Sequence, residues 1–257
     1  MIHIPPLDPN VAARKGFRES EERLKRFWTA VEVKERTGAH GSGWAVTLDG
    51  RTPKTPAHAQ LVLPTEAAAR LVAGEWAAQG EFIDPAAMPA TRLASTAIDR
   101  VRLAREPVAE EIAAFAGSDL LCYLADHPTS LAVEQAREWT PWRDWAALEL
   151  GVTLEAAEGI VHRPQDPAAI ARVRDLALRL DDFALTGLAV AVPLLGSAVL
   201  GLAVQRGALS GEVAFELSRL DEAFQERQWG VDAEAAERTA GRRAEAVLLD
   251  RWFRALG

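Results

Sequence analysis

The first third of the chain alternates apolar and polar residues with a period of two. Residues 26–36 (RFWTAVEVKER) and 44–48 (WAVTL) show this alternation, which is typical of half-buried strands. Asp49-Gly50 follows them as a strong signal for a two-residue turn, and 60–64 (QLVLP) is another short apolar run. The pattern predicts a small β-sheet at the N-terminal end of the chain.

After residue 64 the apolar residues recur with the helical period of 3.6. Leu71, Val72 and Trp76 would share one face of a helix that Thr65 caps. Pro107 is suited to the first turn of another helix. Apolar stripes predict further helices over 130–139, 141–150, 167–180, 183–205, 211–229 and 232–256. Ser210 and Asp232 are expected to cap the last two of them.

This succession of patterns predicts an α+β fold. Strand patterns stand at the start of the chain and helical patterns fill the remainder, with few strand signals among them. We expect a small N-terminal β-rich domain with one or two helices, residues 1–88, followed by a larger all-α domain, residues 89–257.

Residues 183–204 (FALTGLAVAVPLLGSAVLGLAV) contain no charged side chain. The run exceeds the roughly 18 residues that mark a candidate membrane span. Pro193 in its middle, together with the lack of an aromatic belt and of Lys/Arg flanks, favours a helix buried inside a helical domain. We expect one helix broken near Pro193 or two short helices, and no stable membrane insertion. An integral membrane protein is the alternative.

Composition and charge narrow the classes of function. The net charge of −8 argues against nucleic-acid binding, because a nucleic-acid surface needs clustered Lys and Arg. The single cysteine leaves no internal disulfide and no Cys-based zinc site, which indicates a reducing compartment. Residues 1–16 have no apolar core of a secretory signal. We expect a protein of the bacterial cytoplasm, with the mitochondrial matrix as the eukaryotic equivalent.

The stretch SDLLCYLADH, residues 118–127, holds the parts of a nucleophilic site, a thiol, an imidazole and carboxylates. Cys122 and His127 are five residues apart, however, which places them on different faces of a helix. Pro128 also disfavours a helical conformation for His127. The pattern favours a buried small apolar residue at Cys122 over a catalytic one. An enzyme of unknown chemistry that uses Cys122 or the glycine loop 37–43 is the alternative.

Several segments in one order carry a resemblance. The chain contains LDGR-x-x-KTP, EW-x-x-Q, MP-x-TRL-x-x-TAIDRV and Q-x-x-x-WG between about residues 26 and 240. It resembles the family of assembly chaperones of the ATP synthase catalytic head, F1, that handle its α subunit. The resemblance implies a non-enzymatic protein without cofactor or metal. Such a protein binds the free α subunit, shields its β-facing surface until β replaces it, and is a monomer when free.

A partner-binding face is predicted within residues 211–229. Val213, Leu217, Leu220 and Phe224 would form an inward stripe on one helix. The opposite face would carry two aromatic side chains, two carboxylates and an amide, a combination typical of interfaces. These candidate residues are Phe215, Glu222, Gln225, Glu226 and Trp229. The spacing leaves open whether this face is exposed or covered by a second layer of the domain, and the resemblance favours the interface.

Two further clusters have a structural and a functional interpretation. In EWAAQ, Trp76 fits the core, while Glu75 and Gln79 would face a neighbouring element or solvent. Arg51 and Lys54 follow the Asp49-Gly50 turn on an edge strand, where they could pair with acids of a partner or guard the edge against aggregation.

Overall fold

The N-terminal part forms a three-stranded antiparallel sheet, as the alternation predicts. The structure is a computed structural model that describes residues 24–38, 41–159 and 162–257. Strands β1 (Val31–Gly38), β2 (Gly41–Leu48) and β3 (Val62–Leu63) lie in the order β1-β2-β3. The glycine loop is thus a hairpin connection between antiparallel strands, although its residues 39 and 40 lie outside the described residues.

The Asp49-Gly50 turn is confirmed. Both residues have positive φ, 47° and 80°, which is the conformation of the favoured two-residue hairpin turn. Leu48 and Arg51 close the turn with two backbone hydrogen bonds of 2.8 and 3.0 Å. The backbone N–H groups of Ala30 and Thr29 donate to the Asp49 carboxylate and hold its pKa below the usual value.

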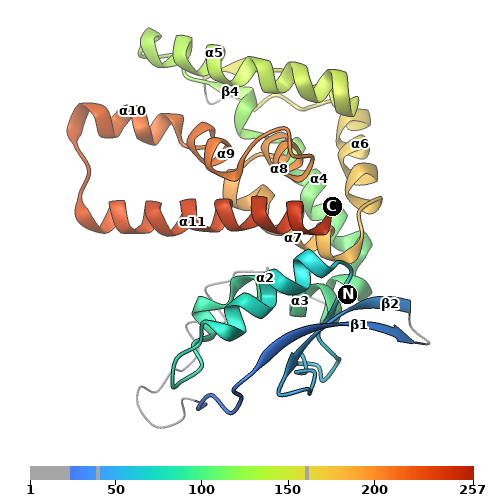
Figure 1. The fold of residues 1–257 in the computed structure, drawn as a ribbon. Helices are drawn as coiled ribbons and strands as arrows, with labels where there is room; N and C mark the ends of the chain where they lie inside the picture. The colour runs from blue at the N-terminus through green and yellow to red at the C-terminus, as the bar shows by residue number, and fades with distance from the viewer. Residues whose placement is uncertain (1–23, 39–40, 160–161) are drawn as a thin grey trace, which may run out of the picture.

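Helices make up most of the remaining chain, which confirms the α+β fold. Figure 1 shows the sheet with α2 and α3 at one end and α5 at the other, while α11 runs from the end of α10 back toward α2. The helices are α2 (Glu66–Ala77), α3 (Pro89–Asp99), α4 (Arg105–Ala116), α5 (Thr129–Trp145), α6 (Pro167–Leu178), α7 (Asp182–Leu195), α8 (Ala198–Gln205), α9 (Gly211–Leu217), α10 (Leu220–Trp229) and α11 (Ala233–Leu256). Short helical turns η1 (Pro85–Ala87), η2 (Val101–Leu103), η3 (Leu120–Cys122) and η4 (Ala146–Leu150) and the strand pair β4 (Tyr123–Leu124) and β5 (Ala157–Glu158) connect them.

Helices α2 and α3 are joined by polar side chains of the EWAAQ cluster. The Glu75 carboxylate accepts hydrogen bonds of 2.6 and 2.8 Å from the N–H groups of Ala90 and Thr91, in the first turn of α3. Gln79 is buried, and its side-chain oxygen accepts from the Asp84 N–H. Glu75 and Gln79 therefore face neighbouring backbone. Helix α3 lies against both α2 and α7, and the predicted domain boundary at residue 88 stays a prediction.

The uncharged stretch 183–204 forms the two helices at the centre of the core, α7 and α8. The chain turns at Gly196, which has φ +65° and ends α7, and Ser197 caps α8. Of the two expected arrangements, the two short helices are confirmed. The alternative of one helix broken near Pro193 is wrong, because Pro193 lies inside α7 on its exposed side. Ser197 is fully buried, so the apolar residues around it in the sequence belong to the core. Within the described ranges, no helix combines the length and apolarity that a membrane crossing requires.

Two other helix boundaries differ from the prediction. The segments 130–139 and 141–150 form a single helix, α5, which continues through Pro141 and ends in the wider turn η4. The segment 211–229 is divided into α9 and α10 at Ser218-Arg219. Pro107 lies in the first turn of α4, and Asp232 caps α11 by accepting from the Ala235 N–H, both as predicted.

A fully buried carboxylate, Asp119, ties the end of α4 to the start of α8. Its two oxygens accept hydrogen bonds of 3.1 Å from the N–H groups of Leu121 and Val199. Burial raises the pKa of Asp119 to about 6, although hydrogen bonds from Ser197 and from these N–H groups oppose the change. The folded state therefore holds a proton on Asp119 over a pH range in which the unfolded state has lost it.

The free energy of unfolding should fall as the pH rises from about 4 to about 6, because the folded state binds the extra proton in that window. The loss amounts to roughly 3 kcal/mol from a pKa difference of about two units. We expect the unfolding free energy of the parent minus that of Asp119→Asn to fall by that amount across the window. Denaturant titrations at four pH values measure it, and a difference that is independent of pH would contradict the assignment.

Candidate partner-binding site

Cys122 is a residue of the hydrophobic core. It is 2% exposed, and burial together with the charge of Asp119 raises the pKa of its thiol to about 12, with Arg143 acting in the opposite direction. Because the thiolate is the nucleophilic form, this environment disfavours the reactive form of the sulfur at neutral pH. Among the described residues, no hydrogen bond joins Cys122 to a histidine, and no group of three or more His, Cys, Asp or Glu could hold a metal ion.

The predicted face on residues 211–229 is divided by the break between α9 and α10. Ser218 donates its hydroxyl to the Phe215 carbonyl at 2.7 Å, and Arg219 has a non-helical backbone. The orientation predicted for α9 is wrong for Val213 and Phe215, although Leu217 is buried as predicted. Phe215 is 2% exposed and lies in the core, whereas Val213 is 47% exposed. Phe215 therefore does not share an exposed face with the residues of α10.

Helix α10 lies on the surface and buries none of its residues. Glu222 and Gln225 are exposed, and Trp229 at the end of the helix is 77% exposed. Their spacing of three and four residues places them along one side of the helix. We call Glu222, Gln225 and Trp229 the α10 face. This face is solvent-accessible. The spacing left open whether a second layer of the domain covers it, and no described part of the chain does so.

Glu226 lies beside the α10 face in a more enclosed position. It forms an ion pair with Arg219, which precedes the first turn of the helix. Both side chains are largely buried, so their attraction is screened less than that of an exposed pair. This pair connects the two ends of α10 and strengthens a helix of only ten residues.

Helix α10 is fixed to α5 by contacts that the sequence did not reveal. The side chain of Gln135, fully buried, donates to the Asp221 carboxylate and accepts from the Ala125 N–H at 2.6 Å. Burial raises the pKa of Asp221, as does the charge of Glu222, while the hydrogen bond from Gln135 lowers it. Arg227 also pairs with Glu134 at 2.6 Å. These contacts hold the α10 face in a defined orientation.

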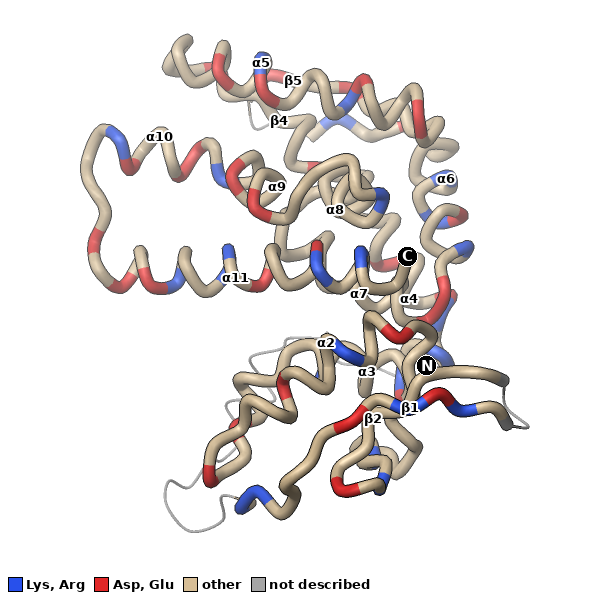
Figure 2. The backbone as a smooth tube through the Cα atoms, in the orientation of Figure 1, with Lys and Arg blue, Asp and Glu red and all other residues tan. Residues whose placement is uncertain are grey.

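Charged residues of both signs alternate along the α10–α11 surface. Figure 2 shows blue and red segments interspersed along both helices, without a stripe of one sign. Several of these charges are paired, such as Arg238 with Glu234 within α11 and Arg243 of α11 with Glu216 of α9. A basic stripe for nucleic acid is absent from these two helices. The distribution favours a protein surface as partner.

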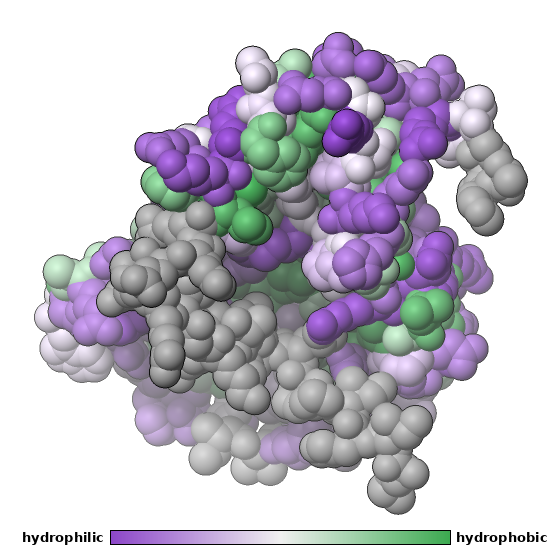
Figure 3. Space-filling model, turned by 90° about the horizontal axis from the view of Figure 1, so that it is seen from below, coloured by the Kyte–Doolittle hydropathy of each residue, from purple (hydrophilic) through white to green (hydrophobic). Residues whose placement is uncertain are grey.

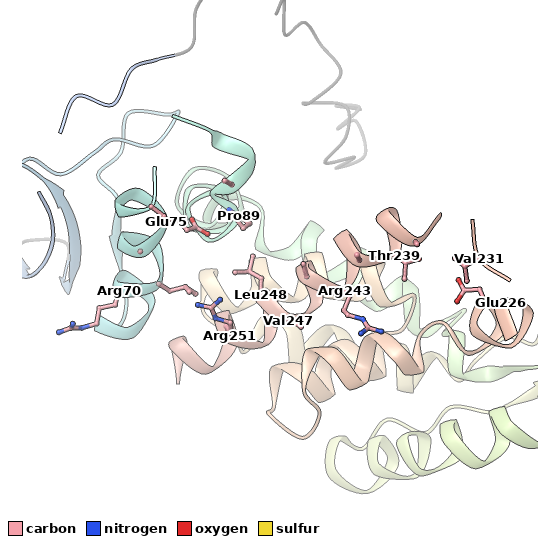
Figure 4. Close-up of a pocket in the computed structure, with 17 residues that line it drawn as sticks. Arg70, Glu75, Pro89, Glu226, Val231, Thr239, Arg243, Val247, Leu248 and Arg251 are labelled. Carbon is pink, nitrogen blue, oxygen red and sulfur yellow. The ribbon is translucent and has the colours of Figure 1, made fainter. Parts of the chain in front are cut away.

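An open groove adjoins the α10 face. It has a volume of about 1000 Å³ and lies between α2 and the turn before α3 on one side and α11 on the other. Glu226 and Val231 line its end nearest α10, as Figure 4 shows. In the view from below, apolar residues are visible at the bottom of a hollow that has hydrophilic residues along one side (Figure 3). A signal in the sequence that could have indicated this groove is the spacing of four between small residues on α11, namely Ala236, Ala240 and Ala244.

Arg51 and Lys54 lie away from the α10 face, on the edge that follows the Asp49-Gly50 turn. Both are exposed, and in the described part of the chain neither forms an ion pair. Backbone bridges of Leu48 with Arg51 and of Lys54 with Gln60 extend the sheet only briefly here. The position is consistent with either of the two interpretations of these charges.

Comparison with known proteins connects the sequence motifs to a family. A family model described as ATP12 chaperone protein matches residues 25–147. The crystal structure of Atp12 from Paracoccus denitrificans is similar, with 43% identity over 91% of this chain and 98% of that chain, and a TM-score of 0.85. A mutant of the same P. denitrificans protein has 42% identity, the same coverage and the same TM-score.

A third solved structure, the Atu1473 protein from Agrobacterium tumefaciens, extends the similarity to nearly all of this chain. It has 37% identity over 98% of this chain and 92% of its own, with a TM-score of 0.85. The motifs, the fold and these similarities agree. The chain belongs to the ATP12 chaperone family, the F1-ATPase assembly chaperones that its sequence motifs indicated.

Proposed function

We propose that this protein is a non-enzymatic chaperone that binds the free α subunit of F1-ATPase and shields the surface that α presents to β. It releases α when β takes its place. The protein acts as a monomer in the bacterial cytoplasm and uses no cofactor. Membership of the ATP12 family supports the assembly role, and the α10 face is the observation that carries the proposed binding site.

The α10 face has the chemistry of a protein interface. Trp229 offers a large apolar surface with one hydrogen-bond donor, and it lies next to the amide of Gln225 and the carboxylate of Glu222. Burial of an exposed tryptophan against a partner removes apolar surface from water, which contributes favourably to the free energy of binding. The contacts of α10 with α5 reduce the conformational entropy lost on binding, because the helix is already oriented.

Co-expression with the α and β subunits of the same organism tests the function. A tagged chain should retain α and not β, and it should release α when β is added, since both would compete for one surface of α. Retention of β, or of neither subunit while both are soluble, would contradict the proposed client. Measurement of the free chain by size-exclusion chromatography with light scattering checks that it is a monomer.

Reversal of one charge on the α10 face tests the site in the same assay. Glu222→Lys should leave the unfolding temperature within the usual range of a surface substitution, because Glu222 is exposed and makes no ion pair among the described residues. Retention of α should fall at least tenfold, corresponding to about 1.4 kcal/mol. Glu237→Lys, an exposed acid on α11, is the matched control. An equal loss of α with both variants would remove Glu222 from the site.

A further inference from the structure

The groove between α2 and α11 follows one side of α11 for about four turns. The residues of α11 that line it recur at intervals of three or four positions and include Ala236, Ala240, Arg243, Val247 and Arg251. These intervals keep them on a single face of the helix. Ala236, Ala240 and Val247 are exposed to solvent. Because apolar surface in water costs free energy, a groove of about 1000 Å³ with such a face favours an apolar occupant.

Small residues on both walls leave room for a helix between them. Gly74 and Ala78 line the groove from α2, and Ala240 lines it from α11. The distance at which two helices pack depends on the side chains at their contact, and small ones allow a close approach. Leu71 and Leu248, both half-buried, supply an apolar floor that large side chains of an occupant can reach.

The two walls also determine the backbone conformation of the occupant. Both are helices, α2 of 12 residues and α11 of 24 residues, and the interior backbone groups of a helix bond within it. An extended segment on this floor would meet no strand edge, so its buried N–H and C=O groups would lack partners. A helical segment satisfies its own backbone. The groove therefore fits an amphipathic helix, which is a common mode of peptide recognition.

The groove offers a positive charge that no described part of the chain neutralises. Its two carboxylates are engaged, because Glu75 accepts from the first turn of α3 and Glu226 pairs with Arg219. Arg251 is exposed, and among the described residues no ion pair or side-chain hydrogen bond engages it. An available cation in an apolar groove is distinctive in a chain with a net charge of −8. It is complementary to a carboxylate on the occupant.

The two ends of the groove differ in character. Arg70 and Arg251 lie toward one end, as Figure 4 shows. Glu226 and Val231 line the opposite end. Val231 is 51% exposed and follows Trp229 of the α10 face by two residues, so the apolar surface continues from that face into the groove. An occupant that starts beside the α10 face would therefore bring its far end to Arg251.

We propose that the groove between α2 and α11 binds an amphipathic helix of the client, the F1 α subunit. The apolar face of this helix lies on the floor of the groove, and an acidic side chain at one end pairs with Arg251. The inference rests on the proposed function, since the helix belongs to the client. It extends the binding site from the α10 face along four turns of α11.

Filling of the groove by a large side chain tests the proposal. Ala240→Trp should weaken binding of α at least tenfold, because the indole would occupy the space of the helix. Ala171→Trp, at an exposed position of α6, is the matched control and should bind α as the parent does. Titration of α against the immobilised full chain measures the affinity. Thermal unfolding checks that both variants fold, which their exposed positions favour.

Reversal of the charge of Arg251 tests the expected ion pair. Arg251→Glu should also weaken binding at least tenfold, whereas Arg251→Lys should retain most of the affinity because it keeps the charge. Arg206→Glu, an exposed arginine in the turn that ends α8, is the control for the change in net charge. Equal losses with Arg251→Glu and Arg206→Glu would exclude a specific pair in the groove.

Photo-cross-linking in the complex with α tests the helical conformation. Thr239→Cys and Val247→Cys, each labelled with a benzophenone maleimide, place probes eight positions apart on α11, or about 12 Å. Cys122 is 2% exposed and should escape the label. The two probes should link to residues of α about eight positions apart, as expected for a helix along the groove. A separation of about four positions would indicate an extended segment and contradict the proposal.

The outcomes separate a failure of this inference from a failure of the proposed function. If the parent chain does not retain α, the proposed client is wrong, and the assignment of the helix to α is wrong with it. If the parent retains α while Ala240→Trp and Arg251→Glu bind it equally well, only the groove is excluded. Links from Thr239→Cys and Val247→Cys to the same chain or to a second copy, in place of α, would assign the groove to another occupant.

Discussion

Replacement of Trp229 by alanine should weaken capture of the proposed client, the F1 α subunit, about 30-fold or more. This is equivalent to about 2 kcal/mol, which is the loss typical of an interface hot spot. Trp229 ends α10 with 77% of its surface exposed. The free energy of unfolding should therefore remain within about 0.5 kcal/mol of the parent value. Loss of binding without loss of stability separates a partner-binding residue from a structural one.

Titration of the α subunit against the immobilised chain measures this effect, and chemical denaturation measures the stability. Phe27→Ala is the matched control, because Phe27 is an aromatic residue of similar exposure, 73%, on the N-terminal segment. Capture should be unaffected by that substitution. A parallel loss of unfolding free energy in Trp229→Ala would instead place Trp229 among the residues that hold α10 to α5.

Local signals predicted the sheet and most helix starts correctly. The Asp49-Gly50 turn and the caps at Thr65, Ser210 and Asp232 are decided by residues close in sequence, and each has the expected geometry. Hydrogen bonds of a cap or a turn involve residues two to four positions apart. A single sequence contains all the information that such contacts require.

The orientation of Phe215 could not be predicted in the same way. A continuous helix over 211–229 would place Phe215 with Trp229, but the chain turns at Ser218-Arg219 and each half packs on a different neighbour. Helix α9 lies against α11, and the indole N–H of Trp139 on α5 donates to the Leu217 carbonyl at 2.9 Å. These contacts join residues distant in sequence, so periodicity alone does not reveal them.

The contact of Gln135 with Asp221 and the groove share this property. A buried glutamine in α5 has no sequence signal that distinguishes it from an exposed one, because its partner lies 86 residues away. The groove likewise depends on the placement of α2 relative to α11. The sequence predicted which face of α10 is polar and aromatic, and tertiary contacts determine that this face is exposed beside a groove.

Gly211→Ala should destabilise the fold by roughly 3 kcal/mol and lower the unfolding temperature on the order of 10 °C. A Cβ atom at Gly211 would lie 2.0 Å from the carbonyl oxygen of Ala246, where α9 begins and packs on α11. The obstructing atom belongs to the backbone of a helix, so no change of a side-chain rotamer relieves the overlap. Helices α9 and α11 would have to separate.

Gly241→Ala in the interior of α11 should have the opposite effect. No atom lies within 4 Å of a Cβ at Gly241, and alanine favours a helix by about 0.5–1 kcal/mol over glycine. The same chemical change therefore lowers the unfolding temperature at one position and raises it at the other. Calorimetry of both variants measures the pair. Equal shifts would mean that the close approach of α9 to α11 at Gly211 does not exist in the folded protein.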